Sequence, residues 1–329
     1  MFATKRTLVY ALLVTGLTVP AENAGIESVR KATAVLWRNP VDIASRNLYY
    51  GPGGPQHQPH GPYIFVKEDL DGSNPKFVVK DRDGIKWKVK LGVEARPETA
   101  ATRLIWAVGY FANEDYFLSD VRVENMPAHL HRGQSLVAPD GSVHNVRMKR
   151  EDEKKIGDWK WRHNPFTGTR EWNGLRVMMA LINNWDLKDQ NNSVYRNATL
   201  GNVYMVSDLG ASFGSGSPHV PIAHAKGDLR FYRHSRFIRD EDVTTVSFGD
   251  PGRPEWLWFV HPIEYFKRIR LCWIGRDIPR ADARWAGDLL SRLSDRQIED
   301  AFRAAGYPDR EARGFASTVQ RRIAELSEL

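Results

Sequence analysis

Three strand-like runs follow one another closely after residue 62, and they restrict the fold more than any other part of the chain. The runs are YIFVKED, KFVVKD and IKWKVKL, and each one alternates apolar with polar residues or is rich in β-branched residues. LDGSNP separates the first two runs, and RDG, with the tight-turn pair Asp83-Gly84, separates the second from the third. Because turns this short join neighbouring antiparallel strands, the sequence predicts an antiparallel meander.

A helix is predicted directly after the meander, in the segment RPETAATRLIWAVGYF. Pro97 suits the first turn of this helix, Glu98 complements the positive end of its dipole, and Gly109 suits its end. Three apolar residues share one helix face at three- and four-residue spacing: Leu104, Ile105 and Val108. Two further strands are expected in DYFLSDVRVEN and SVHNVRMKR.

The rest of the chain is predicted to be mainly helical. REWNGLRVMMALINN has a helical pattern and follows a connector that begins EDEKK, whereas NVYMVSDLGASFG indicates a short strand that ends in a Gly/Ser-rich loop. The last 48 residues contain three helical segments, of which Ser294 suits the N-cap of the second and Asp309 lies near the start of the third. Strands first and helices afterwards predict the α+β fold class.

Composition limits the kind of partner that the chain can have. The 329 residues are 42% hydrophobic, which is enough for a sizeable core, and the net charge of +7 suits an anionic ligand. No long Lys/Arg run and no nucleic-acid-binding motif is present, so we expect no nucleic-acid partner. Cys272 is the only cysteine, which excludes an intrachain disulfide and a cysteine-based metal cluster.

The N-terminus has the layout of a secretory signal peptide. Lys5 and Arg6 precede an apolar stretch from Leu8 to Val19, and a small residue, Ala21, follows at the expected cleavage site. The apolar stretch is too short to span a bilayer comfortably, so we expect export and no stable membrane span. The alternative is that this stretch forms a buried N-terminal helix.

The residues that suggest chemistry are concentrated in LINNWDLKDQNNSVY and in the SDLG that follows it. Asp186 and Asn191 are five positions apart, Lys188 lies between them, and Asp208 comes 22 residues after Asp186. Phosphoryl transfer from ATP needs such a set: a carboxylate that orients the acceptor hydroxyl, and an amide and a second carboxylate that hold Mg²⁺. Either motif alone would also fit an ordinary polar loop, but their order and context agree.

These motifs resemble those of the protein-kinase-like superfamily. WDLKDQN matches the D-L-K-x-x-N catalytic loop of that family, and SDLG resembles its metal-binding D-F-G with Leu209 in place of Phe. The helix ETAATRLIWAVGY and the short loop GSNPK look like the glutamate helix and phosphate loop of HipA-like kinases. Asn184-Trp185 replaces the usual His-Arg before Asp186, and neither G-x-G-x-x-G nor A-P-E is present. The resemblance is therefore to the atypical branch, which includes HipA-like, phosphatidylinositol and secretory-pathway kinases.

The resemblance implies a two-lobed fold with an antiparallel-sheet N-lobe, a mainly helical C-lobe and extra C-terminal helices. It implies ATP as the nucleotide and Mg²⁺ or Mn²⁺ as the metal. The expected boundaries are a signal peptide (1–21), an N-terminal extension with a Gly/Pro loop (22–62), the N-lobe (63–150), the C-lobe (151–281) and a C-terminal helical extension (282–329).

The resemblance also implies a role for each site residue. Asp186 would be the base or orienting carboxylate, and Lys188 would lie near the transferred phosphate. Two residues would bind the metal: Asn191 and Asp208. Glu98 would pair with a strand lysine, which is Lys90 or, less favoured, Lys88, because residues two apart share one face of a strand. The backbone of the phosphate loop would approach the phosphates at Gly72 and Ser73.

The sequence thus predicts an exported phosphotransferase that acts on an unknown protein, sugar or lipid hydroxyl. Three alternatives stay open: a kinase-fold enzyme that transfers AMP or another group, a nucleotide-binding pseudokinase, and an exported carbohydrate-binding protein. The last alternative depends on aromatic side chains that could stack on a sugar, although core packing is their default interpretation: Trp159, Trp161 and Trp172.

Overall fold

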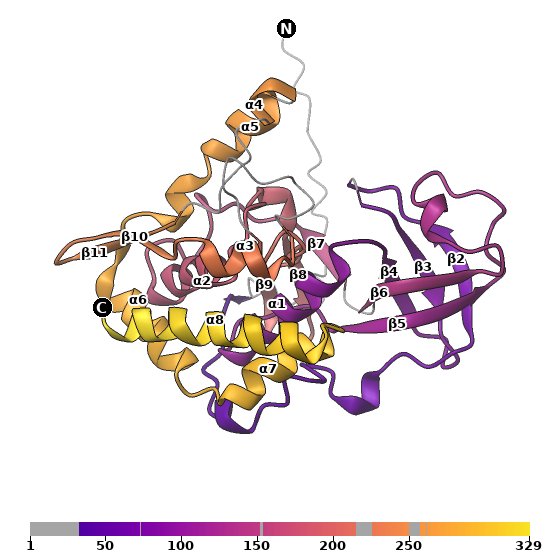
Figure 1. Ribbon diagram of the computed structural model, residues 1–329, viewed down its shortest axis with the longest axis horizontal. Helices are drawn as coiled ribbons and strands as arrows, with labels where there is room; N and C mark the ends of the chain where they lie inside the picture. The colour runs from indigo at the N-terminus through magenta and orange to yellow at the C-terminus, as the bar shows by residue number, and fades with distance from the viewer. Residues whose placement is uncertain (1–32, 73, 152–153, 215–225, 250–256, 261) are drawn as a thin grey trace, which may run out of the picture. The chain divides into compact units, whose positions relative to one another are not determined.

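The computed structural model describes residues 33–329 except 73, 152–153, 215–225, 250–256 and 261 (Figure 1). The predicted signal peptide and the phosphate-loop residue Ser73 lie outside the described residues. No helix within the described part of the chain is both long enough and apolar enough to cross a membrane.

The predicted meander is present, and it belongs to a five-stranded barrel. The strands are β2 (Tyr63–Glu68), β3 (Lys76–Lys80), β4 (Lys86–Lys90), β5 (Asp115–Glu124) and β6 (Ser142–Arg150). Their order is β2-β3-β4-β6-β5, and the neighbours in this order are antiparallel. A parallel pairing of Tyr63 with Val123 and of Ile64 with Glu124 joins β2 to β5 and closes the barrel. The sequence did not predict this closure.

Alternation along the strands fills the barrel with apolar side chains. Phe77, Val79, Trp87 and Val89 are fully buried and belong to the barrel cluster, to which β6 adds Met148. On β4, Lys88 and Lys90 alternate with the buried Trp87 and Val89. The two lysines therefore lie on the opposite face of the strand. This alternation directs two lysine side chains away from the barrel interior.

Helix α1 (Ala95–Ala107) follows β4 and ends, as predicted, just before Gly109. Gly109 has a φ of +97°, and a Cβ atom there would lie 2.3 Å from the carbonyl oxygen of Arg38. The position therefore requires glycine. The apolar face of α1 packs into the core of the helical part through Leu104 and Ile105, rather than into the barrel.

A second sheet supports the residues that follow α2 (Arg170–Leu181). Its order is β1 (Ala34–Val35), β9 (Gly201–Val206), β8 (Asn192–Asn197) and β7 (Lys154–Gly157). Strand β9 is the predicted strand before Asp208, whereas β7 lies in the segment predicted to be a connector and β8 was not predicted. The β8–β9 hairpin places the segment before β8 next to the segment after β9.

The remaining elements form the helical part of the chain, on the left of Figure 1. The predicted C-terminal helices are α6 (Arg280–Leu290), α7 (Asp295–Ala304) and α8 (Asp309–Ser327), and Ser294 caps α7 in a capping box, as expected. A small sheet of β10 (Ile238–Glu241), β11 (Thr245–Phe248) and β12 (Ile278–Pro279) was not predicted. Three shorter helices complete the set: α3 (Leu229–His234), α4 (Leu257–Val260) and α5 (Pro262–Ile269).

The buried apolar residues form two main clusters, one inside the barrel and one in the helical part that includes α1. The α+β fold class with a strand-built N-lobe and a helix-rich C-lobe is therefore confirmed. Trp159, Trp161 and Trp172 are at most 5% exposed and belong to the helical cluster. Because these side chains are buried, they are not available to stack on a sugar.

Candidate functional site

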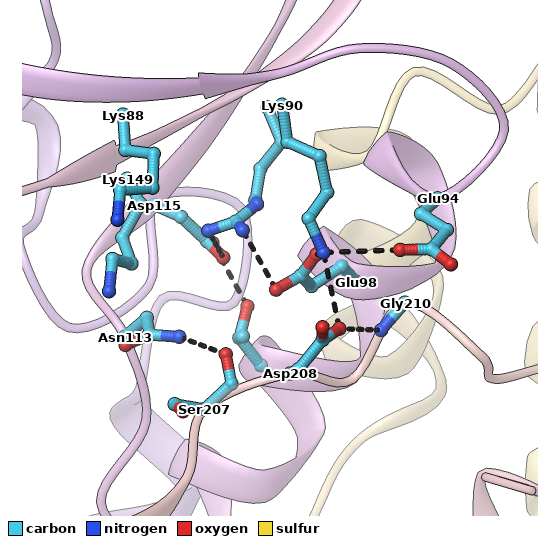
Figure 2. A network of polar contacts seen from close by, with 12 residues as sticks. Lys88, Lys90, Glu94, Glu98, Asn113, Asp115, Lys149, Ser207, Asp208 and Gly210 are labelled. Atoms are coloured by element: carbon cyan, nitrogen blue, oxygen red, sulfur yellow. Dashed lines mark hydrogen bonds and ion pairs between the residues drawn. The ribbon is translucent and has the colours of Figure 1, made fainter. Parts of the chain in front are cut away.

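Lys90 is the centre of a group of buried charges at the end of β4. Its Nζ atom lies 2.7 Å from Glu98 Oε2 on α1, 3.1 Å from Glu94 Oε2 and 3.1 Å from Asp208 Oδ1 (Figure 2). Burial by itself would lower the pKa of Lys90, but the charges of Glu98, Asp208 and Glu94 outweigh burial and raise that pKa well above its usual range. Lys90 is therefore a permanent cation at neutral pH.

Glu98 is held on its other side by a second cation. Arg147 of β6 forms an ion pair with Glu98, with its Nη2 atom 2.8 Å from Oε1, and its Nη1 atom lies 3.8 Å from Asp115 Oδ2. Arg103 of α1 completes this group with a 3.0 Å ion pair to Asp115 Oδ1. Because all four side chains are at most 3% exposed, α1 is fastened to the barrel in a fixed rotation. This attachment sets the position of Glu98 relative to Lys90.

Lys88, the other strand lysine considered from the sequence, takes part in a different network. Its Nζ atom lies 2.7 Å from Asp69 Oδ2 and 3.0 Å from Glu151 Oε1. Glu98 therefore pairs with Lys90 rather than with Lys88. The two lysines do share one face of β4, but the acids that surround them come from different elements.

Asp208 follows β9 and faces Lys90 across the junction of the two lobes. Its Oδ1 atom also accepts a hydrogen bond from the backbone N–H of Gly210 at 3.3 Å, and its side chain is 40% exposed. Burial raises the pKa of Asp208, but Lys90 and the Gly210 N–H lower it more strongly, to about 2. Asp208 is thus ionised at any physiological pH and open on one side.

The loop from residue 183 to residue 191 is fixed by its own amides. Asn183 takes a φ of +52°, which turns the chain sharply after α2. Asn184 Oδ1 accepts from the backbone N–H of Asp186 at 3.0 Å, and the Asn191 side-chain amide donates to the carbonyl oxygen of Asp186. These bonds set the orientation of Asp186, whose Oδ1 atom lies 3.5 Å from Lys188 Nζ.

The two motif loops are joined directly. The backbone N–H of Asp208 donates to the carbonyl oxygen of Asn191 at 3.2 Å, and that of Ser207 donates to the same oxygen at 2.8 Å. Asn113, which precedes β5, donates from its side-chain amide to the carbonyl oxygen of Ser207 at 2.8 Å (Figure 2). The β8–β9 hairpin therefore brings Asn191, at the end of the first motif, into contact with Asp208 in the second.

A cleft of about 600 Å³ lies where these groups meet. Six residues predicted from the sequence line it: Gly72, Lys90, Asp186, Lys188, Asn191 and Asp208. Glu98 lies behind Lys90 and does not line the cleft, and Lys88 does not line it either. The structure thus places in one cleft six of the nine residues that the kinase-like motifs singled out.

Three residues that sequence reasoning missed also shape this site: Glu94, Arg147 and Lys226. Glu94 contacts Lys90, accepts from the Asn74 side chain at 2.5 Å, and lies 2.5 Å from Lys226 Nζ through its other oxygen. Glu94 could have been found because it lies one helical turn before Glu98. Arg147 and Lys226 carry no local signal, because their roles depend on tertiary packing.

The oxygen ligands in the cleft fit a hard divalent cation. Asn191 uses its amide nitrogen on Asp186, and none of the described residues donates to Asn191 Oδ1. Asp208 supplies a partly exposed carboxylate nearby in the same cleft. Amide and carboxylate oxygens are the ligands that Mg²⁺ prefers. The carboxylates of Glu94, Glu98 and Asp208 also approach within 4.8 Å of one another, but Lys90 Nζ contacts all three and so takes the place of a metal ion there.

The chain matches no protein-family profile and no curated protein sequence, but it is similar to solved structures. Among solved structures, it is similar to the Helicobacter pylori proinflammatory kinase CtkA, at 9% sequence identity and a TM-score of 0.45, over 82% of this chain and 98% of that one. It is also similar to the Golgi casein kinase, at 11% identity and a TM-score of 0.34, over 82% of this chain and 73% of that one.

The geometry itself identifies the type of fold. A five-stranded N-lobe contributes a strand lysine, the helix after that strand contributes the glutamate that pairs with it, and two loops joined by a hairpin contribute Asp186, Asn191 and Asp208. This is the two-lobed arrangement that the kinase-like motifs in the sequence predict, with a strand-built lobe and a helix-rich lobe.

Proposed function

We propose that this protein is a phosphotransferase that uses ATP and Mg²⁺ and acts on a hydroxyl acceptor. The observation that carries the proposal is the convergence, in one cleft, of a lysine held by a helix glutamate with the three polar residues of the motif loops. Phosphoryl transfer needs positioning and charge stabilisation more than covalent chemistry, and this set of groups supplies both. The proposal includes export of the protein, a hydroxyl group as the acceptor and ATP as the nucleotide.

Each group has a defined task in this proposal. Lys90 would bind the phosphates of the nucleotide, and Glu98 would keep Lys90 in place while it does so. Asn191 and Asp208 would hold Mg²⁺, which, when bound, neutralises the charge on the phosphates. Asp186 would orient the acceptor hydroxyl and take up its proton, and Lys188 would stabilise charge on the transferred group.

The wall of the cleft beyond Lys188 is the proposed place for the acceptor. Trp185 and Leu271 supply apolar surface there, next to Lys188 and Gln190. A hydroxyl carried on a partly apolar group would suit this wall.

The test is incubation of the protein with ATP labelled at the γ or at the α position, followed by measurement of label on the chain and of released phosphate. We expect transfer of γ label or Mg²⁺-dependent ATP hydrolysis by the wild type. We expect both to be lost in Asp186→Asn, which should still bind Mg-ATP. Transfer of α label would instead indicate AMP transfer, and binding of Mg-ATP without any transfer would indicate a pseudokinase.

Export is tested separately, because ATP is scarce outside the cytoplasm and the site alone does not determine location. We propose that residues 1–21 direct export. A reporter enzyme fused to residues 1–25 should be secreted, whereas retention of the reporter in the cytoplasm would remove this part of the proposal.

A further inference from the structure

A second cavity, of about 590 Å³, lies beside the N-terminal end of α1 and outside the set of groups described above. We call it the α1 pocket and define it by Val93, Arg96, Leu136, Lys226, Tyr307 and Glu311, which all line it. Val93 comes from the turn before α1 and Arg96 from its first residues, Leu136 from the connection between β5 and β6, Lys226 from the segment before α3, and Tyr307 and Glu311 from the turn before α8 and its first residues. Lys226 is the only one of these six that also lines the cleft.

Arg96 gives the α1 pocket a positive charge without a counter-ion. Its guanidinium donates to Asn145 Oδ1 at 2.9 Å and lies 5.7 Å from the ring centres of Phe117 and Tyr307. No carboxylate of the described residues pairs with Arg96, and its buried Nε atom has no hydrogen-bond partner among them. A half-buried arginine that is held by rings and an amide, with donors left over, is well suited to bind an anion.

Tyr307 supplies a second polar group without a partner. The side chain is only 6% exposed, and its hydroxyl forms no hydrogen bond with any described residue. The hydroxyl lies against Gly227, another residue of the pocket lining, where a Cβ atom would approach it to 2.4 Å. A buried hydroxyl without a partner costs free energy, and a ligand that accepts its hydrogen bond would remove that cost.

The rim of the α1 pocket is apolar. Val93 is 63% exposed and Leu136 is 43% exposed, and both line the cavity. Exposed aliphatic side chains next to uncompensated donors fit a ligand that has an apolar part and an anionic part. Glu311, the carboxylate of the lining, is exposed and pairs with no described cation, so the anion would bind at the Arg96 side.

We propose that the α1 pocket binds a small molecule that carries a phosphate or carboxylate group on an apolar body. The anionic group accepts hydrogen bonds from Arg96 and from the hydroxyl of Tyr307, and the apolar body covers Val93 and Leu136. This site does not depend on the proposed phosphotransferase activity, because the four residues that would contact the ligand have no part in that activity.

The test is a calorimetric titration of the full chain with phenyl phosphate, and with inorganic phosphate in parallel. We expect phenyl phosphate to bind at least about three-fold more tightly, since its ring covers apolar surface. Arg96→Gln should weaken phenyl phosphate binding about ten-fold or more. The matched control is Arg122→Gln, which makes the same change on the exposed face of β5, away from the pocket, and should leave the affinity unchanged.

Two further variants locate the site. Tyr307→Phe removes only the hydroxyl, so it should weaken binding of phenyl phosphate without lowering the unfolding midpoint of the free protein. Lys188→Met should leave the affinity unchanged, because Lys188 lines the cleft and not the α1 pocket. The proposal is overturned if phenyl phosphate does not bind, if Arg96→Gln and Arg122→Gln bind it equally, or if Lys188→Met rather than Arg96→Gln abolishes binding.

Discussion

Lys90 differs from its neighbour Lys88 mainly in how deeply its side chain is buried. Lys88 and Lys90 lie on the same face of β4, but the side chain of Lys88 is 25% exposed and that of Lys90 is 5% exposed. Three carboxylates contact Lys90, and such an arrangement is stable only because Arg147 and Lys226 contact the same acids. A nucleotide phosphate would thus meet a lysine whose charge and position are already fixed.

The first prediction compares the two strand lysines. Lys90→Met should lower the free energy of unfolding by about 3–5 kcal/mol, because it leaves buried carboxylates without their central cation. Lys88→Met is the matched control and should cost about 1 kcal/mol or less, because its ion pairs are partly exposed. Urea unfolding of the wild type and both variants measures this difference, and equal losses would show that Lys90 is not the centre of the network.

The second prediction concerns how the contribution of Asp208 to stability changes at acidic pH. The pKa of Asp208 is lowered from 3.8 to about 2 in the folded state, so its ionisation stabilises the fold above pH 3.8 and this contribution is lost as the pH falls towards 2. Asp208→Asn should therefore be less stable than the wild type near neutral pH, and the difference should shrink as the pH falls from about 4 to about 2. Urea unfolding at several pH values measures this difference. A difference that stays constant with pH would contradict the assigned pKa.

At the scale of elements, the C-terminal helix α8 supports the loop that carries Asp186. Arg322 of α8 is 1% exposed and donates to the carbonyl oxygens of Ala180 and Leu181, at the end of α2. The carbonyl oxygen of Ala180 also accepts from the backbone N–H of Asn183, and that of Leu181 accepts from the Tyr232 hydroxyl, so Arg322 is a further donor to the last turn of α2. The C-terminal helices carry none of the kinase-like motifs. Through Arg322 they are nevertheless connected to the end of α2, from which the loop with Asp186 starts.

The third prediction tests this connection. Arg322→Met should lower the free energy of unfolding by about 2–4 kcal/mol, since the buried hydrogen bonds from its charged guanidinium to α2, Tyr232 and Ser235 are lost at once. The adjacent Arg321 is a matched control, because it is exposed and pairs with Glu325 at 3.8 Å within the same helix. Arg321→Met should cost less than about 1 kcal/mol. If both variants unfold at the same urea concentration as the wild type, α8 does not stabilise the end of α2.

The same elements show what the sequence could predict. The meander, α1, α2 and the C-terminal helices have local signals, namely period-two or helical patterns, tight turns and caps. The closure of the barrel depends on a parallel pair between β2 and β5, which are far apart in the sequence and carry no mark of each other. Strand β8 was missed because its first residues, Asn192 and Ser193, are polar although they are buried.

The site was predictable to a similar extent. The spacing of Asp186, Asn191 and Asp208 is a local property, and the structure places all three in one cleft. The choice between Lys88 and Lys90 was not local, because it depends on where Asp69 and Glu151 lie after folding. The same reason hides Lys226, because Glu94, the carboxylate with which it pairs, lies 132 residues earlier in the sequence.

At the scale of the whole molecule, the cleft lies where two independently packed clusters meet. Lys90 comes from the strand-built lobe, and Asp208, which is 118 residues later, comes from the lobe that contains the second sheet. A ligand that contacts both residues therefore links the two lobes. Binding of such a ligand should stabilise the whole fold by mass action.

The central claim is that this cleft binds Mg-ATP through Lys90 and Asp208, and a thermal-shift titration tests it most directly. The melting temperature of the wild type should rise as Mg-ATP is added, rise less with ATP in the presence of a chelator, and stay unchanged in Asp208→Ala. A wild-type melting temperature that does not respond to Mg-ATP, or one that rises equally in Asp208→Ala, would contradict the account.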